Sequence, residues 1–367
     1  MRATRRAMLS AAAFAAAAGT APAANDRTAQ GNDAILDLGR LGLKPLDAGH
    51  DNYSVLQSAF ESASAGNCPV IVIPPGIYRV SRPLRINHPL TLLGGGAFDM
   101  NAARSGTVIV AEGFSEPVLS IAPAVEDRLR GFCIAGLLFD CSHKSNGMSL
   151  RRCADFSLSR IGVRAATGFG LEFRNTWDAV VTDAFVSECG AADASLGAID
   201  IAGEAFGDNT NSLHFIGARV ESSRGPSLIV HPPAPGAGPQ NNIQFVASKF
   251  HHPAGDGSTP PTPNLILHPA QAIGFHGAQI FDSGKGFPVI AFGRSQAIDP
   301  GYAFLGCDID VRVGDALFGG DIGPGHQFLG CTLRADLGAH EAKPFHRAGS
   351  DQAQRIKSLN ALYRIAT

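Results

Sequence analysis

The most regular feature of the sequence is a short pattern of apolar and small residues that recurs along its second half. Each copy holds an apolar residue, a spacer, Phe, a spacer, a small residue and, three positions later, another apolar residue. The clear copies are centred on Phe215, Phe245, Phe275, Phe304 and Phe328. Looser copies are centred on Ile134, Leu158 and Val181, and successive centres lie 23 to 34 residues apart.

This pattern predicts an all-β solenoid. Apolar and polar residues alternate within each copy, as they do on a half-buried strand, and Gly or Pro separates the copies. A single copy cannot bury its apolar side, but stacked coils can, with the strands of each coil pairing with those of the next. The variable spacing indicates loops at one corner of the coil, and the Pro-rich segments 231–239 and 253–263 are predicted to be such loops.

The two ends of the chain carry a helical pattern instead. Residues 51–65 have apolar residues at helical spacing and are followed by Gly66, a residue that ends helices well. Residues 350–366 carry a second stripe, formed by Ile356, Leu359, Tyr363 and Ala366. We predict that both helices cap the solenoid, because its open ends would otherwise expose core and strand edges.

The segment around the first predicted helix resembles the start of a known family. The helix carries the pair Leu56-Gln57, residues 70–78 form an apolar run that ends in Pro-x-Gly-x-Tyr, and a further strand ends at Gly94. Over residues 33–96 this combination resembles the pectate-lyase-like superfamily and, within it, the rhamnogalacturonase/epimerase-like, glycosyl hydrolase 28-related group. The resemblance implies a right-handed parallel β-helix that binds or cleaves polysaccharide.

The resemblance specifies a fold more closely than a reaction. The Asp-Gly-x-x-Asp-Asp stretch of the family is degraded to Asp-Ala-Gly-His-Asp-Asn at residues 47–52. The Asp-Asp and Gly-His-Gly motifs of polygalacturonases and the Asp-Pro-His-Asp motif of alginate epimerases are absent. Arg355-Ile356-Lys357 matches a polygalacturonase motif only by chance, because no paired aspartates precede it. A fold alone does not fix a function.

The N-terminus resembles a twin-arginine export signal. Arg5-Arg6 precedes an Ala-rich run and a small-residue cleavage site, so residues 1–24 are predicted to be removed and the mature protein to be periplasmic or secreted. Removal takes away three arginines and no acidic residue, which lowers the net charge from −2 to −5. The remaining chain is predicted to comprise a lead segment (25–50), the β-helix with its first cap (51–335) and a C-terminal segment with the second cap (336–367).

The composition excludes several classes of function. A net charge of −2 lacks the basic excess of a nucleic-acid-binding protein, and no apolar run is long enough to span a membrane. None of the seven cysteines has metal-site spacing. Cys307 and Cys331 occupy the same place in successive repeats; they are predicted to join a stack of small buried residues, with a disulfide as the alternative.

The repeats also predict where polar side chains gather. If each repeat Phe points inward, the residues four and six positions later point outward on one strand face. Successive coils are about 4.8 Å apart, so these residues form two columns, whose first four pairs span roughly 14 Å. The pairs are Arg219 and Glu221, Lys249 and His251, Gln279 and Phe281, Asp308 and Asp310, and Thr332 and Arg334.

These columns contain the groups that a polysaccharide lyase needs. A base removes the proton next to a uronate carboxylate, and a cation stabilises the negative charge that develops. Lys249 or His251 is a candidate base, and Arg219 is a candidate for holding the carboxylate. The remaining candidate substrate contacts are Glu221, Arg334 and, on the middle coil, His276 and Asp282.

Two other functions stay open. A glycoside hydrolase would use two carboxylates, and Asp308 and Asp310 are spaced about 7 Å apart on one strand face. A non-catalytic polysaccharide-binding or assembly protein would explain the missing family motifs. For any single residue, a solvated outer sheet of mixed charges is the plain alternative. The predicted partner is a polysaccharide or oligosaccharide, with no nucleic acid; a monomer and a trimer are both left open.

Other chemistry has weaker support. His251-His252 with Asp256 or His268 has irregular spacing for a metal site, and Asp308, Asp310 and Asp315 lack the EF-hand pattern. No cofactor is therefore assigned, and Ca²⁺ is left open. A run of arginines around Arg151-Arg152 is a candidate surface for an anionic polymer, with scattered solubilising charge as the alternative. Trp177, the only tryptophan, is interpreted as part of a strand-entry turn.

Overall fold

The computed structural model describes most of the predicted solenoid. The described residues are 35–45, 49–62, 69–96, 106–124, 128–205, 208–252, 261–293, 301–311, 316–320, 322, 325–336 and 361–365. The predicted export signal lies outside them. Within the described part, no helix has the length and apolar character needed to cross a membrane.

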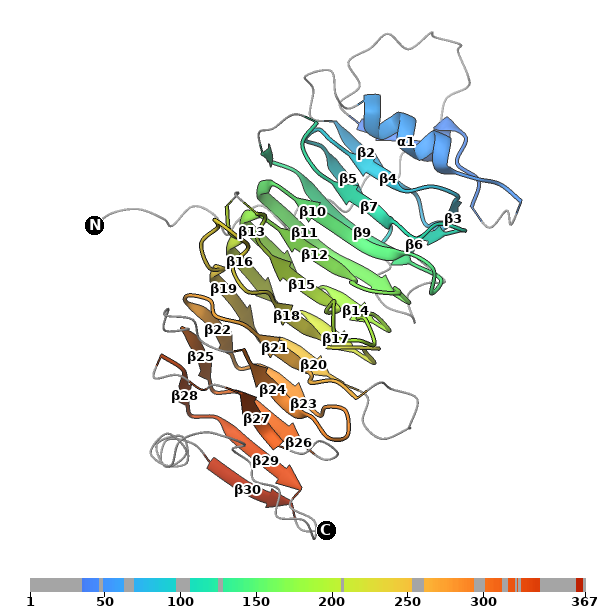
Figure 1. The fold of residues 1–367 in the computed structure, drawn as a ribbon. Helices are drawn as coiled ribbons and strands as arrows, with labels where there is room; N and C mark the ends of the chain where they lie inside the picture. The colour runs from blue at the N-terminus through green and yellow to red at the C-terminus, as the bar shows by residue number, and fades with distance from the viewer. Residues whose placement is uncertain are drawn as a thin grey trace, which may run out of the picture. The chain divides into compact units, whose positions relative to one another are not determined.

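The described chain is a parallel β-helix whose strands form three columns, and strands of successive coils lie side by side (Figure 1). The first column of strands is β1 (Ile35–Asp37), β2 (Val70–Val72), β5 (Thr91–Leu93), β13 (Trp177–Thr182), β16 (Asn211–Ile216), β19 (Asn241–Val246), β22 (Ile273–His276), β25 (Tyr302–Leu305) and β28 (Gln327–Leu329). The second column is β3 (Gly76–Val80), β6 (Thr107–Ala111), β14 (Phe185–Ser187), β17 (Arg219–Glu221), β20 (Lys249–His251), β23 (Gln279–Phe281), β26 (Asp308–Val311), β29 (Thr332–Asp336) and β30 (Ala361–Ile365).

Two long strands, β9 (Cys133–Asp140) and β11 (Cys153–Arg164), run through both of these columns, and the short β8 (Leu129–Arg130) pairs with β11. The third column is a separate sheet. It holds β4 (Leu84–Ile86), β7 (Pro117–Ile121), β10 (Asn146–Arg151), β12 (Leu171–Arg174), β15 (Ile199–Ala202), β18 (Leu228–Val230), β21 (Leu265–Leu267), β24 (Pro288–Phe292) and β27 (Ala316–Gly320). The predicted all-β solenoid is confirmed.

The core is built on a ladder of phenylalanine rings. The five Phe of the clear repeats are buried and stack in coil order, with centroid separations of 4.6 Å (Phe215 to Phe245), 5.0 Å (Phe245 to Phe275), 4.7 Å (Phe275 to Phe304) and 4.8 Å (Phe304 to Phe328). These separations match the spacing of paired strands, about 4.8 Å, so ring stacking and backbone pairing favour the same coil spacing.

The small residue of each repeat marks the bend between the first and second columns. Gly217, Gly277, Gly306 and Gly330 have φ angles of 60° to 68° there, and Ala247 has a φ of 49°. Gly adopts this left-handed conformation without steric cost, which explains why it is the most frequent residue here, although Arg160 and Asp183 adopt the same conformation (φ 51° each) in the looser copies.

The first end of the solenoid is covered by α1 (Tyr53–Ser62), which lies within the predicted helix (Figure 1). Leu56 is fully buried in the core, and the side chain of Gln57 bonds to the edge of β4. Gln57 Oε1 accepts from the Arg85 N–H at 2.9 Å, and Gln57 Nε2 donates to the Arg85 carbonyl at 3.2 Å. The Leu-Gln pair therefore buries apolar surface and satisfies backbone groups of an open strand edge.

The other end of the chain differs from the prediction. Residues 361–365 form β30, which pairs in parallel with β29, so the predicted helix over 350–366 is wrong in this part. Residues 351–360 lie outside the described part. The physical reason is that β29 leaves an unpaired edge, and a strand satisfies its backbone groups directly, whereas a helix has only its own hydrogen bonds.

The spacing of the repeats suggested that the two Pro-rich loops lie at one corner of the coil, but the structure places them at different corners. Residues 231–239 connect β18 to β19, and residues 253–263 connect β20 to β21, of which 253–260 lie outside the described residues. The first loop leaves from the third column and the second from the second column, because insertions are tolerated at any surface corner of a coil.

The six cysteines in the described part of the chain form no disulfide with one another. Cys307 and Cys331 are buried at equivalent positions of successive coils, as a stack of small core residues requires. Cys141, Cys153 and Cys189 are also buried, whereas Cys133 is partly exposed. Burial raises the pKa of Cys153 and of Cys189 to about 12.

We expect Phe275→Ala to lower the free energy of unfolding by about 3–5 kcal/mol, because it removes a buried ring stacked on both neighbours. Urea titration followed by circular dichroism measures the change. Ile216→Ala is the control, since this side chain is 43% exposed, and its effect should stay within about 0.5 kcal/mol. Equal losses in the free energy of unfolding for the two substitutions would contradict a stabilising role of the stacked phenylalanine rings.

We expect a thiol reagent at neutral pH to label Cys133 in the folded protein and to leave Cys141, Cys153 and Cys189 unmodified. The thiolate is the reactive form, and these three thiols are both shielded and held protonated by burial. Mass spectrometric mapping identifies the labelled sites, with urea-unfolded protein as the positive control. Rapid labelling of Cys153 or Cys189 under native conditions would contradict this burial.

Candidate functional site

The strand register places the predicted polar pairs side by side. Arg219, Lys249, Gln279, Asp308 and Thr332 are successive partners across the second column, and so are Glu221, His251, Phe281, Asp310 and Arg334. Within each pair the intervening residue is buried in the core, so the flanking side chains lie on the outer surface. We call this outer surface of β17, β20, β23, β26 and β29 the second-column face.

Two cations on this face share one carboxylate. Glu221 Oε1 lies 2.9 Å from Arg219 Nη2 on its own strand and 2.9 Å from Lys249 Nζ on the next coil. The side chain of Glu221 is only 23% exposed, and that of Arg219 is 50% exposed. Burial alone would raise the pKa of Glu221, but the hydrogen bonds and positive charges of Lys249 and Arg219 outweigh burial and lower the pKa below its ordinary value.

This ion-pair cluster gives the two candidate bases, Lys249 and His251, different surroundings. The Nζ of Lys249 donates to Glu221 Oε1 at 2.9 Å, so this amine is already engaged by a carboxylate, which opposes a role as a base. His251 is partly buried beside it, and its ring meets the ring of Phe281 edge-on at a centroid distance of 6.3 Å. His251 is the register partner of Glu221 across β17 and β20, and its imidazole is the remaining candidate for a general base.

The two predicted hydrolase carboxylates have different surroundings. Asp308 forms an ion pair with Arg334 of the next coil, with Nη1 at 2.9 Å from the carboxylate. Asp310 is only 1% exposed, and its backbone carbonyl accepts from the N–H of Asp282 at 2.9 Å. The pair expected to face solvent together therefore consists of one ion-paired and one buried carboxylate.

His276 and Asp282 do not join the second-column face. His276 belongs to β22 in the first column, where its Nε2 lies 2.8 Å from Gln244 Oε1 and the ring borders a groove of about 250 Å³. Asp282 follows β23 in a left-handed conformation (φ 60°) and is 6% exposed. The sequence placed both on the correct coil, but the bends of the chain turn them away from the columns.

The weaker metal candidates gain no support from the geometry. Across the described ranges, no three His, Cys, Asp or Glu side chains converge as metal ligands. His252 is buried and its Nε2 contacts Thr262 Oγ1 at 3.2 Å, while Asp256 and Asp315 lie outside the described residues. Trp177 begins β13, and the guanidinium of Arg128 covers its ring at 3.4 Å.

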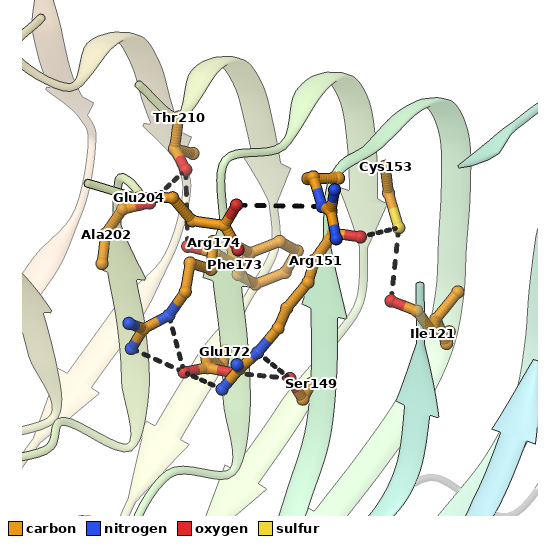
Figure 2. Close-up of polar contacts among 11 residues, drawn as sticks. Ile121, Ser149, Arg151, Cys153, Glu172, Phe173, Arg174, Ala202, Glu204 and Thr210 are labelled. Carbon is orange, nitrogen blue, oxygen red and sulfur yellow. Dashed lines mark hydrogen bonds and ion pairs between the residues drawn. The ribbon is translucent and has the colours of Figure 1, made fainter. Parts of the chain in front are cut away.

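A second charged cluster lies on the third column (Figure 2); the sequence analysis named Arg151 within an arginine run but not its partners Glu172 and Arg174. Glu172 on β12 bonds to Ser149 and Arg151 on β10 and to Arg174 on its own strand. One coil further on, Asp200 Oδ2 lies 2.9 Å from His231 Nε2. The available signal was a carboxylate between two apolar core residues in successive coils, as in Leu171-Glu172-Phe173 and Ile199-Asp200-Ile201.

Comparison with known proteins identifies structural likeness at low sequence identity. ORF18 of Geobacillus virus E2 is 20% identical with a TM-score of 0.66 over 82% of this chain, and the match spans 57% of the viral protein. PfbA, a surface adhesin of Streptococcus pneumoniae, is 10% identical with a TM-score of 0.52, covering 82% of this chain and 78% of PfbA.

The A-module of the Azotobacter vinelandii mannuronan C-5 epimerase AlgE6 is 16% identical with a TM-score of 0.49, covering 89% of this chain and 98% of the module. No protein-family model matches the sequence, and no curated protein matches it. At these identities, the likeness to the viral protein and to the adhesin shows a shared fold, the parallel β-helix.

Proposed function

We propose that the protein is an exported enzyme that acts on an acidic polysaccharide at the second-column face, most simply as a lyase. The observation that carries this proposal is the cluster in which Arg219 and Lys249 share Glu221 next to His251. Two positive charges against one negative charge leave this part of the face positive, as recognition of a uronate requires. The export part of the proposal rests on residues 1–24 of the sequence.

The chemistry assigns different roles to the three polar groups. The half-exposed guanidinium of Arg219 holds the uronate carboxylate and stabilises the negative charge that develops on it. His251 takes the proton from the carbon next to that carboxylate, and the electron pair forms a double bond to the adjacent carbon. The bond from that adjacent carbon to the glycosidic oxygen breaks, and the imidazolium returns the proton to the leaving oxygen.

Lys249 and Glu221 position the reactive groups in this scheme. Glu221 fixes the guanidinium of Arg219 and the ammonium of Lys249 at 2.9 Å each, so both cations stand on neighbouring coils in defined places. The hydrolase alternative has weaker geometry, because Asp308 is ion-paired and Asp310 is buried.

A second candidate function is binding without cleavage. It is favoured by one specific observation: each cation of this face that the structure describes already pairs with a carboxylate, Arg219 and Lys249 with Glu221 and Arg334 with Asp308. Such a face can hold a polymer by exchanging ion pairs without any reaction, as an assembly or adhesion protein would.

The proposal is tested by incubating the protein with anionic and neutral polysaccharides, with and without Ca²⁺. We expect ultraviolet absorbance from unsaturated uronates and reducing ends to rise together on an acidic polymer. We also expect His251→Gln to lower the rate by about 10²- to 10⁴-fold, because it removes the base. The control is His214→Gln, an exposed residue on the first column.

Each other outcome identifies a different function. Reducing ends without new absorbance would indicate a hydrolase, and binding without either product would indicate the non-catalytic alternative. An unchanged lyase rate in the His251→Gln variant would remove His251 from the reaction.

We expect the ion-pair cluster to make stability depend on pH. A lowered folded-state pKa of Glu221 stabilises the fold above the ordinary value of 4.5, and this contribution disappears as pH falls through the folded-state pKa. At neutral pH the free energy of unfolding of the wild type should exceed that of the Glu221→Gln variant by up to about 1 kcal/mol, because partly exposed ion pairs contribute little to stability. Urea unfolding at several pH values measures the difference, with exposed Glu116→Gln as control. A difference that persisted at acid pH would show that packing, rather than charge, is responsible.

A further inference from the structure

The third column carries a charged cluster that the proposed function does not use. In Figure 2, Ser149 and Arg151 from β10 and Glu172 and Arg174 from β12 converge, with Glu172 at the centre. Arg151 and Arg174 are register partners on adjacent coils, and so are Ser149 and Glu172. The intervening residues of both strands are buried in the core, so these four side chains lie on the outer face of the sheet.

Glu172 is buried, and both of its oxygens are occupied. Oε1 accepts from Arg174 at 2.8 Å (Nη2) and 3.1 Å (Nε), and from Arg151 Nη2 at 3.4 Å. Oε2 accepts from Ser149 Oγ at 2.5 Å and from Arg151 Nε at 3.2 Å. The residue is 1% exposed, and a carboxylate so deeply buried is tolerated only with charged partners of this kind.

The same contacts orient the two arginines. Each guanidinium uses its Nε and Nη2 edge for Glu172, and within the described part of the chain neither Nη1 has a hydrogen-bond partner. The side chains of Arg151 and Arg174 are 48% and 31% exposed, so these remaining donors are accessible to a ligand. The three residues together carry one net positive charge.

The neighbouring acidic residue does not neutralise this charge through a direct contact. Asp200, one coil further on, accepts from the Gly197 N–H at 2.9 Å and contacts His231 Nε2 at 2.9 Å. It is fully buried, and none of its described contacts involves Arg151 or Arg174. Among the described residues, Glu172 is therefore the carboxylate that holds both guanidiniums, and Ser149 Oγ accepts a further hydrogen bond from Arg151 Nε at 3.2 Å.

We propose that Arg151 and Arg174 form a binding site for the oxyanion groups of an acidic polymer, either uronate carboxylates or sulfate esters. Glu172 is the positioning residue, because it fixes two guanidinium groups on adjacent coils and leaves a donor of each exposed. Planar guanidinium groups recognise such oxyanions with paired hydrogen bonds, and pre-orientation lowers the entropy lost on binding. The site goes beyond the proposed function, because it binds on another column and requires no reaction at His251.

The test measures binding of fluorescently labelled polygalacturonate, dextran sulfate and neutral dextran by fluorescence anisotropy. We expect the wild type to bind at least one of the two anionic polymers and not the neutral one. In the triple variant Arg151→Gln/Glu172→Gln/Arg174→Gln, binding should weaken by about tenfold or more, as loss of charged hydrogen bonds predicts. Replacing Glu172 at the same time avoids an unpaired buried charge, and thermal unfolding checks that the variant is folded.

The matched control is Arg40→Gln, which removes one positive charge from a side chain that is 87% exposed and far less constrained. A second variant, Arg151→Lys/Arg174→Lys, keeps the charge but loses the guanidinium geometry, and we expect its affinity to fall as well. The preferred polymer distinguishes a carboxylate from a sulfate ligand.

The inference is overturned if the wild type binds neither anionic polymer, or if the folded triple variant binds both as tightly as the wild type. Loss of binding in this variant in a protein that cleaves no polymer would uphold the inference while the proposed function fails.

Discussion

Each coil of this protein is buried only by the coils above and below it, and this constraint determines the rest of the structure. The phenylalanine rings stack at 4.6 to 5.0 Å, close to the spacing of about 4.8 Å that backbone pairing requires. Core packing and backbone pairing therefore favour the same register between coils, and this register determines which outward side chains are neighbours. The geometry of both charged clusters follows from the packing of the core beneath them.

A shared register places like charges next to each other, and the protein resolves the resulting repulsion in the same way twice. Arg219 and Lys249 are register partners and share Glu221; Arg151 and Arg174 are register partners and share Glu172. In each cluster a carboxylate from one of the two strands bridges both cations, so that adjacent coils attract one another where they would otherwise repel.

The sequence predicts those features that repeat. The Phe spacing gives the inward ladder, and counting four and six residues from it gives the two outer columns in their observed register. It did not predict that Asp310 is covered or that Lys249 is held by Glu221, because these depend on contacts between coils. Arg151 was noted only as part of an arginine run, because the third-column strands lack the Phe repeat that would have aligned it with Arg174. The segment of β30 was predicted as a helix because the spacing of apolar residues carries no information about an unpaired neighbouring strand edge.

The two clusters differ in how firmly their carboxylate is held, and this difference determines whether a ligand can replace that carboxylate. Glu221 is partly exposed, so the carboxylate of the proposed substrate would be able to compete with it for Arg219. Glu172 is buried and saturated with donors, so no ligand can displace it without exposing a desolvated charge. A site that exchanges partners suits turnover, whereas a site with a fixed internal anion suits retention. The two proposals therefore assign different tasks to the two faces: the third column retains the polymer, and the second column processes it.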